Sequence, residues 1–297
     1  MTPTSPKIIF FGTEDHSLGT LKALVENGFS VAAVVTKPDA PRGRGHKLAA
    51  PPVKTFALKH NIPVWQPTRL RDIADDIRAL QPVAGVLVAY GKIIPQPIID
   101  LFTPGIINLH PSLLPLYRGP SPIEAAIANR DAETGVTIMQ LEAGMDSGPV
   151  YCQQTVALSG DETRPELYQT LFSLGEQMLT ETLPNILTGK LDPTPQDDSQ
   201  ATYCSLLSKE DSLLDPAAIT APIAEAHVRA HLGFPRTRLS IGDTPLIITQ
   251  AHIDHTKTSP LSVRCKDGLY LTVDELIAPS GKTMSAESFV RGYGHVL

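Results

Sequence analysis

Short apolar runs alternate with helix-length amphipathic stretches through the first half of the chain. The runs lack the polar alternation of a strand that faces water on one side, so they predict strands buried on both faces. These strands are expected at Ile8–Phe11, Val31–Thr36, Pro63–Trp65, Val83–Ala89 and Ile106–Leu109. Between them, helices are expected at Leu18–Glu26, Val53–His60 and Ile73–Leu80. Strand and helix in alternation predict an α/β fold, with a parallel sheet covered by helices on both faces.

The pattern changes after Met145. Thr163–Leu187 has the length and the apolar face of one long helix, and the polar stretch Asp192–Gln200, with its two prolines, predicts a linker. Beyond Tyr203 the chain is rich in short β-type runs at hairpin spacing, interrupted by a helical stretch at Ala221–His231. The expected strands are Arg238–Ile241, Pro245–Ala251, Leu261–Cys265 and Gly268–Val273. Several short strands with one helix predict a small barrel or sandwich, of the oligonucleotide-binding (OB) type.

Composition agrees with two globular domains in a chain of 297 residues that is 42% hydrophobic and 19% charged. We expect a first domain over residues 1–189, a linker over 190–205 and a C-terminal β-barrel domain over 206–297. Apolar runs are too short for a membrane span of about 20 residues, and the first residues do not resemble a signal peptide. Cys152, Cys204 and Cys265 are widely spaced and odd in number, which favours free thiols in a reducing cytoplasm.

The net charge of −6 means that a polyanionic partner would have to bind at a local basic patch.

Three polar residues are the candidates for chemistry. Asn108 and His110 flank Leu109 at the end of a predicted strand, so the period of two places their side chains on one face. Asp146 lies in a Gly-Met-Asp-Ser-Gly turn after the expected strand Val136–Leu141. An amide donor, an imidazole and a carboxylate at the carboxyl edge of an α/β sheet suit acyl transfer, because they stabilise an oxyanion and move a proton.

Spacing alone leaves a second interpretation open for each residue. A histidine at a strand end is commonly structural, and an aspartate between glycines commonly serves the turn.

A longer run of motifs gives these residues a context. Asn108-Leu109-His110-Pro111-Ser112-Leu113-Leu114-Pro115, then Tyr117-Arg118-Gly119, Glu133-Thr134-Gly135-Val136-Thr137 and Asp146-Ser147-Gly148 resemble the signature of the 10-formyltetrahydrofolate-dependent formyltransferases. The resemblance implies a Rossmann-like formyltransferase domain followed by a smaller OB-like β-barrel domain. It also implies an enzyme whose catalytic residues are Asn108, His110 and Asp146.

The same resemblance implies how the co-substrate is bound. The residues expected to contact the folate are Ser112, Leu113, Leu114 and Pro115, together with the main chain of Val88, Ala89, Tyr90 and Gly91. The formyl donor would be 10-formyltetrahydrofolate, attacked at its formyl carbon by an amine, with neither a metal ion nor a covalent enzyme intermediate. Asn108 and His110 would stabilise the oxyanion, and Asp146 would fix His110 and help to remove the amine proton.

The basic stretch Lys37–Lys54 indicates which kind of molecule accepts the formyl group. It carries Arg42, Arg44 and Lys47 among glycines and prolines. Physically this is a loop suited to phosphate contacts, although a solvated loop with ordinary charges explains it equally well. Its sequence is similar to the acceptor-stem loop of family members that formylate methionyl-tRNA. The resemblance implies initiator methionyl-tRNA as partner, translation initiation as the role, and a cytoplasmic monomer. The alternatives are a nucleotide-sugar amine formyltransferase with the same donor, and a non-catalytic folate- or tRNA-binding module.

His227 and His231 are four residues apart on a predicted helix, the spacing of a metal-binding pair. Without the acidic residue of an HExxH pattern, we expect them to face solvent.

Overall fold

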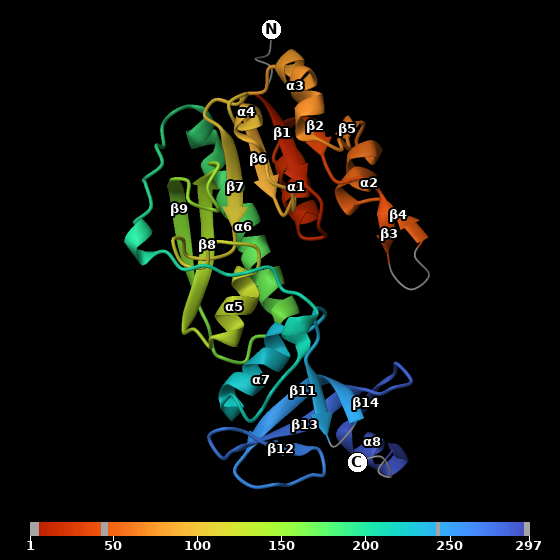
Figure 1. Ribbon diagram of the computed structural model, residues 1–297. Coiled ribbons are helices and arrows are strands. Elements are labelled where there is room, and N and C mark those ends of the chain that lie inside the picture. Colours follow the sequence, from red (N-terminus) through yellow and green to blue (C-terminus); the bar gives the residue numbers. More distant parts are fainter. Residues whose placement is uncertain (1–5, 43–46, 242–243, 294–297) are drawn as a thin grey trace. The chain divides into compact units, whose positions relative to one another are not determined.

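The computed structural model describes residues 6–42, 47–241 and 244–293, and its chain divides into two compact units (Figure 1). The first unit contains the chain up to Arg118, then Gly135–Thr155 and Gln169–Tyr203. The second contains Gly119–Thr134, Val156–Tyr168 and the chain from Cys204 onward. The units are interleaved along the sequence, and the contiguous domain limits expected above stay a prediction.

A seven-stranded sheet forms the centre of the first unit, in the order β5-β2-β1-β6-β7-β8-β9. Its strands are β1 (Lys7–Gly12), β2 (Ser30–Val35), β5 (Val64–Trp65), β6 (Ala84–Val88), β7 (Ile106–His110), β8 (Glu133–Gln140) and β9 (Val150–Ala157). The pairs from β5 to β7 are parallel, as the unalternated apolar runs predicted, whereas β8 runs antiparallel to β7. The expected α/β fold with a Rossmann-like sheet is confirmed, with an antiparallel extension at one side.

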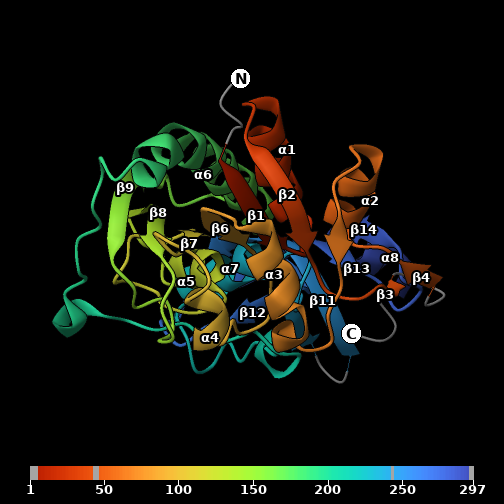
Figure 2. The same cartoon turned by 90° about the horizontal axis from the view of Figure 1, so that it is seen from above.

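Helices cover both faces of this sheet. They are α1 (Ser17–Glu26), α2 (Pro52–Lys59), α3 (Ala74–Leu80), α4 (Gln96–Ile99) and α6 (Arg164–Leu187). Figure 2 shows α1 and α6 on one face and α3 and α4 on the other. Leu109 of β7 meets Gly175 of α6 so closely that a Cβ at Gly175 would clash with it. The side chain of Leu109 therefore lies on the face of the sheet that α6 covers, and the side chains of Asn108 and His110 lie on the opposite face.

Local signals explain where α1 ends. The side-chain amide of Asn27 donates to the Ala23 carbonyl at 2.8 Å, and Gly28 follows with a φ of +79°. A left-handed residue of this kind closes a helix, and glycine adopts it without strain. The helix therefore ends at Glu26, as expected from the sequence.

The strand order reverses direction between β1 and β6, which pair with each other and lead to opposite edges of the sheet. The segments after the two strands meet there: the Thr13 and Glu14 amides both donate to the Ala89 carbonyl, and the Thr13 hydroxyl donates to the Tyr90 carbonyl at 3.1 Å. Ligands of open α/β sheets bind at such switch points. The loop expected to lie beneath the folate is therefore located where this fold class binds ligands.

The second unit has an antiparallel five-stranded sheet, in the order β10-β11-β13-β12 with β14 beside β13. The strands are β10 (Arg238–Ile241), β11 (Thr244–Asp254), β12 (Ser262–Arg264), β13 (Tyr270–Ile277) and β14 (Thr283–Ser285), and the helices are α5 (Pro122–Ala128), α7 (Ala221–Ala230) and α8 (Ala286–Tyr293). Leu239, Ile248, Leu271, Leu276 and Phe289 lie in one buried core with the apolar face of α7. The expected small β domain after residue 203 is confirmed.

The expectation of a solvent-facing histidine pair on α7 is wrong for His231. Its side chain is buried, with 5% of its surface exposed, and its ring centroid lies 5.2 Å from that of the partly buried His227. Burial, together with the neighbouring His227, lowers the pKa of His231 to about 4. The spacing of four residues placed both rings on one helix face, but that face packs inward.

Acid is expected to destabilise the protein through His231. The unfolded chain takes up a proton below the ordinary pKa of about 6.5 and the folded chain does not until about pH 4, so stability is lost as the pH falls through this window. We expect His231→Gln to remove about 2 kcal/mol of the loss in unfolding free energy between pH 7.5 and pH 5. Urea denaturation of both proteins at the two pH values measures it.

His252→Gln is the matched control. The hydrogen bond from His252 Nδ1 to Asp274, 2.8 Å long, raises the pKa of His252, so its stabilisation is present at low pH and is lost as the pH rises. Replacement of His252 should therefore increase the loss in unfolding free energy between pH 7.5 and pH 5, whereas replacement of His231 should reduce it. A His231→Gln protein with the acid sensitivity of the unmodified chain would contradict the prediction.

Candidate active site

Two of the three expected catalytic side chains belong to β7, in the middle of the first unit's sheet. Asn108 is in register with Leu87 of β6 and Met139 of β8, and His110 is in register with Thr137. Both side chains are nearly buried, with 5% and 4% of their surfaces exposed. Among the described residues, no hydrogen bond involves the side-chain amide of Asn108, and this amide is not one of the fully buried groups without a partner. An amide that is accessible and has no protein partner is a ready donor for a ligand oxygen.

His110 and Asp146 approach each other across this site. His110 Nε2 lies 3.0 Å from the Tyr117 carbonyl oxygen, which only accepts, so Nε2 carries a proton. The other ring nitrogen, Nδ1, faces Asp146 Oδ2 at 3.8 Å. Because Nε2 is occupied, Nδ1 is the ring nitrogen that faces the carboxylate. The structure thus brings the three residues of the sequence prediction together.

Asp146 lies on the loop between β8 and β9. Its φ of +46° is in the left-handed region, which aspartate tolerates better than most residues. Gly148 lies so close to the Gln140 carbonyl that an added Cβ would clash with it. The glycine is thus required for a close backbone approach, and the loop turns back immediately after the carboxylate.

The segment Ser112–Pro115 is fixed by two polar side chains. The Thr137 hydroxyl donates to the Ser112 carbonyl at 2.6 Å and accepts from the Leu114 amide at 3.2 Å, while Gln153 Nε2 donates to the Leu114 carbonyl at 2.7 Å. Ser112 is fully buried and its hydroxyl donates to the Leu116 carbonyl, and Leu114 is 4% exposed. Side-chain contact with a ligand therefore falls to Leu113 and Pro115, which are partly exposed.

The segment Val88–Gly91 offers main chain rather than side chains. Ala89 and Gly91 have φ values of +45° and +67°, which form a tight turn after β6. The ring of Tyr90 points into the core between the sheet and α3–α4, where burial raises the pKa of its hydroxyl to about 12. The expectation of main-chain contacts agrees with this orientation.

Comparison with known proteins identifies the family. A family model described as formyl transferase matches residues 6–183, which include β7 and the loop of Asp146. The chain belongs to the formyl transferase family.

Similarity to members of this family extends over nearly the whole chain. A methionyl-tRNA formyltransferase from Trichlorobacter lovleyi is 38% identical over 98% of this chain and 95% of its own. Another from Chloroflexus aggregans is 44% identical over 77% of this chain and 74% of its own. Among solved structures, an N-formyltransferase from Helicobacter canadensis, in complex with folinic acid and dTDP-3-aminofucose, is similar with a TM-score of 0.68, at 18% identity, over 91% of this chain and 99% of that one. At that identity the likeness concerns the fold.

The expected tRNA-binding residues of this formyl transferase lie on a hairpin of β3 (Ala40–Arg42) and β4 (Lys47–Ala49), where Arg42 and Lys47 are in register. Arg44 lies outside the described residues. In the second unit, Arg229 forms two hydrogen bonds with Glu225 and a third with the Glu162 carbonyl. These contacts occupy its guanidinium, so Arg229 is a poor candidate for a phosphate contact.

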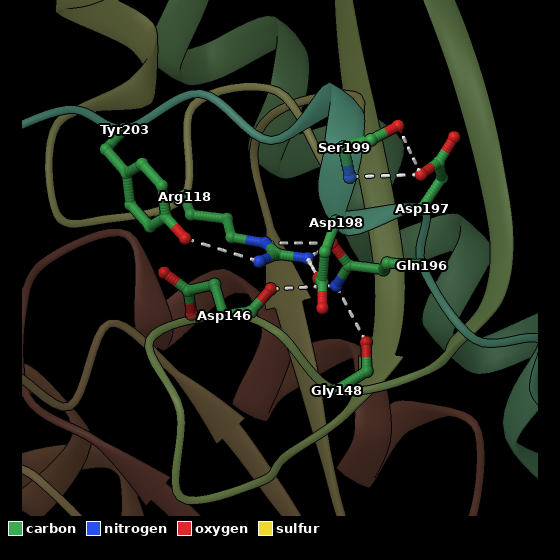
Figure 3. Close-up of polar contacts among 8 residues, drawn as sticks. All are labelled: Arg118, Asp146, Gly148, Gln196, Asp197, Asp198, Ser199 and Tyr203. Atoms are coloured by element: carbon green, nitrogen blue, oxygen red, sulfur yellow. Dashed lines mark hydrogen bonds and ion pairs between the residues drawn. The ribbon is translucent and has the colours of Figure 1, made fainter.

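Two residues that sequence reasoning left without a role lie behind the Asp146 loop of this formyl transferase. Arg118, part of the family motif, is 3% exposed, and Gln196 belongs to the segment expected to be a linker. Figure 3 shows their side chains meeting beside Asp146 and Gly148. The linker is anchored here: Thr194 forms a bridge with Val150, and the Arg118 amide donates to the Thr202 carbonyl. A polar stretch with two prolines carries no signal for such contacts.

The site has no candidate metal centre within residues 6–42, 47–241 and 244–293, where His, Cys, Asp and Glu form no group of three or more able to hold an ion. In the same part of the chain, no helix is long and apolar enough to cross a membrane.

Proposed function

We propose that this protein transfers the formyl group of 10-formyltetrahydrofolate to the free amino group of initiator methionyl-tRNA, in the cytoplasm. The observation that carries the proposal is the convergence of Asn108, His110 and Asp146, with Asp146 Oδ2 3.8 Å from His110 Nδ1. Relatives named methionyl-tRNA formyltransferase, 37–44% identical over most of the chain, support the choice of acceptor.

The folate is bound at the switch point of the sheet. The main chain of Val88–Gly91 lies against the pterin, and Leu113 and Pro115 of the segment fixed by Thr137 line the other side. This arrangement places the formyl carbon beside Asn108. Because the segment is held by hydrogen bonds inside the protein, little ordering is needed when the folate binds.

Transfer begins when the acceptor amine attacks the formyl carbon. The carbonyl oxygen gains negative charge, and the side-chain amide of Asn108 and the Nδ1–H of the protonated His110 imidazole donate hydrogen bonds to it. Asp146 stabilises the imidazolium and accepts the proton that the attacking nitrogen loses. The bond from the formyl carbon to N10 then breaks, and N10 takes up the proton that Asp146 had accepted, which restores the carboxylate. The products are formyl-methionyl-tRNA and tetrahydrofolate.

The acceptor is bound through the basic stretch Lys37–Lys54, in which Arg42, Arg44 and Lys47 contact the phosphates of the acceptor stem. Such contacts are electrostatic, so affinity for tRNA falls steeply as salt is added.

An acceptor assay tests the function. The purified protein and 10-formyltetrahydrofolate are incubated with charged initiator tRNA in one tube and an aminosugar nucleotide in another, and the formylated product is measured in each. We expect formyl-methionyl-tRNA alone, with uncharged tRNA as the blank. If only the sugar is formylated, the acceptor is an aminosugar nucleotide and not methionyl-tRNA. If 10-formyltetrahydrofolate binds but neither acceptor is formylated, the chain is a binding module and not this enzyme.

A further inference from the structure

We propose that Gln196 is a positioning residue that holds the Asp146 loop in its working geometry, with Arg118 as its support. The proposal rests on the proposed function, since it assigns a role in the same reaction. It goes beyond that function because Gln196 touches neither the folate nor the acceptor in the scheme above. Its side chain acts on Asp146 through the main chain.

The side-chain amide of Gln196 joins two points of the loop (Figure 3). Its Nε2 donates to the Asp146 carbonyl at 2.8 Å and to the Gly148 carbonyl at 2.7 Å. A primary amide has two N–H groups, and here each is directed to a different carbonyl on either side of Ser147. One side chain thus closes the turn that carries the carboxylate.

The other end of the same amide is fixed by Arg118. The Nε and Nη2 of Arg118 lie 3.1 and 2.9 Å from Gln196 Oε1. Because a guanidinium only donates and a carbonyl only accepts, the amide has one possible orientation in this place. The side-chain amide of Gln196 therefore forms hydrogen bonds to Arg118 through its oxygen and to the loop through its nitrogen.

Arg118 is itself rigidly held. Its Nη2 lies 2.6 Å from Asp198 Oδ1, and its Nη1 lies 3.4 Å from the Tyr203 hydroxyl. The turn that presents Asp198 is stabilised by Asp197, whose carboxylate accepts from the Ser199 amide at 3.0 Å. The chain of contacts runs from the anchored segment through Arg118 and Gln196 to the loop.

The loop needs such support because it has little of its own. Residues 142–145 are exposed, and the backbone at Asp146 is in the left-handed region. The Asp146 carboxylate lies 3.8 Å from His110 Nδ1, so a shift of about 1 Å decides whether the two groups interact. Misplacement of that size lowers rates on the order of 100-fold in enzymes.

Gln196→Glu is the sharpest test, because glutamate has the same shape, still accepts from Arg118, and donates to neither carbonyl. We expect kcat for formylation of methionyl-tRNA to fall on the order of 10- to 100-fold while KM for both substrates changes less than about threefold. Gln200→Glu is the matched control: it is the same change in the same segment, at an exposed residue, and should leave kcat unaltered. Gln196→Met provides a second variant without donors.

A double-mutant cycle separates positioning from general stability. If Gln196 acts through Asp146, Gln196→Glu has less than about a twofold effect on kcat in an Asp146→Asn background. The proposal would be overturned if the effects of Gln196→Glu and Asp146→Asn on kcat multiplied in the double variant. It would also be overturned if the kcat of both Gln196→Glu and Gln196→Met lay within twofold of that of the unmodified enzyme.

Hydrogen exchange gives a result that is independent of the acceptor. We expect the amides of residues 141–148 to exchange more than about tenfold faster in Gln196→Glu than in Gln200→Glu. Unchanged exchange refutes the anchoring itself. If instead the unmodified protein fails to formylate methionyl-tRNA, the proposed function falls while the exchange experiment still decides whether Gln196 holds the loop.

Discussion

We expect Asp146→Asn to lower kcat by about a thousandfold and to leave the protein folded. Asparagine keeps the size of the side chain but neither accepts the amine proton nor balances an imidazolium at His110, whose Nδ1 faces the carboxylate at 3.8 Å. Asparagine also tolerates the φ of +46° at this position, so the backbone is not strained by the change. Steady-state formylation of methionyl-tRNA, together with a thermal melt, measures both effects.

The choice of asparagine separates chemistry from backbone strain. Alanine at a left-handed position destabilises the loop for steric reasons, and a loss of rate would then have two causes. Asp76→Asn, at an exposed residue of α3, is the control for the same chemical change elsewhere and should leave kcat unaltered. A rate for Asp146→Asn within about tenfold of the unmodified enzyme would remove the carboxylate from proton transfer.

The sequence predicted those parts of the site that follow from local periodicity. Asn108 and His110 share a face of β7 because side chains alternate along a strand, and the structure places both on the side opposite Leu109 and α6. The parallel direction of the strands up to β7 follows likewise from their alternation with helices. Asp146 came from the family motif, since a carboxylate in a glycine-bounded turn has no periodic pattern that directs it to β7.

The remaining features depend on contacts between distant segments. Gln196 bonds to carbonyls 50 and 48 residues away, and a polar stretch with two prolines predicts only an absence of helix and strand. The antiparallel direction of β8 follows from no local pattern, and the apolar pattern did not indicate α5, the short helix between β7 and β8. His231 was misplaced for a similar reason: helical spacing says which residues share a face, but packing decides which face is buried.

Asn108→Leu is expected to lower the activity of the enzyme without lowering its stability. We expect kcat to fall by about 100- to 1,000-fold, because the variant loses a hydrogen-bond donor aimed at the oxyanion. The free energy of unfolding should stay nearly unchanged, since no hydrogen bond among the described residues involves this amide and none is lost in the variant. Asn108 is 5% exposed, and leucine has a similar size, so the packing around β7 changes little.

Kinetics and urea denaturation on the same preparations make the two halves of this prediction separable. Asn185→Leu, at an exposed position of α6, is the matched control for rate. If Asn108→Leu retained kcat within fivefold, the oxyanion would have to be stabilised by His110 alone. If the variant were instead inactive and strongly destabilised, Asn108 would be a structural residue of β7. Loss of rate with full stability is the outcome expected if the amide serves a ligand, because a side chain that the fold needs cannot be replaced by an apolar one without loss of stability.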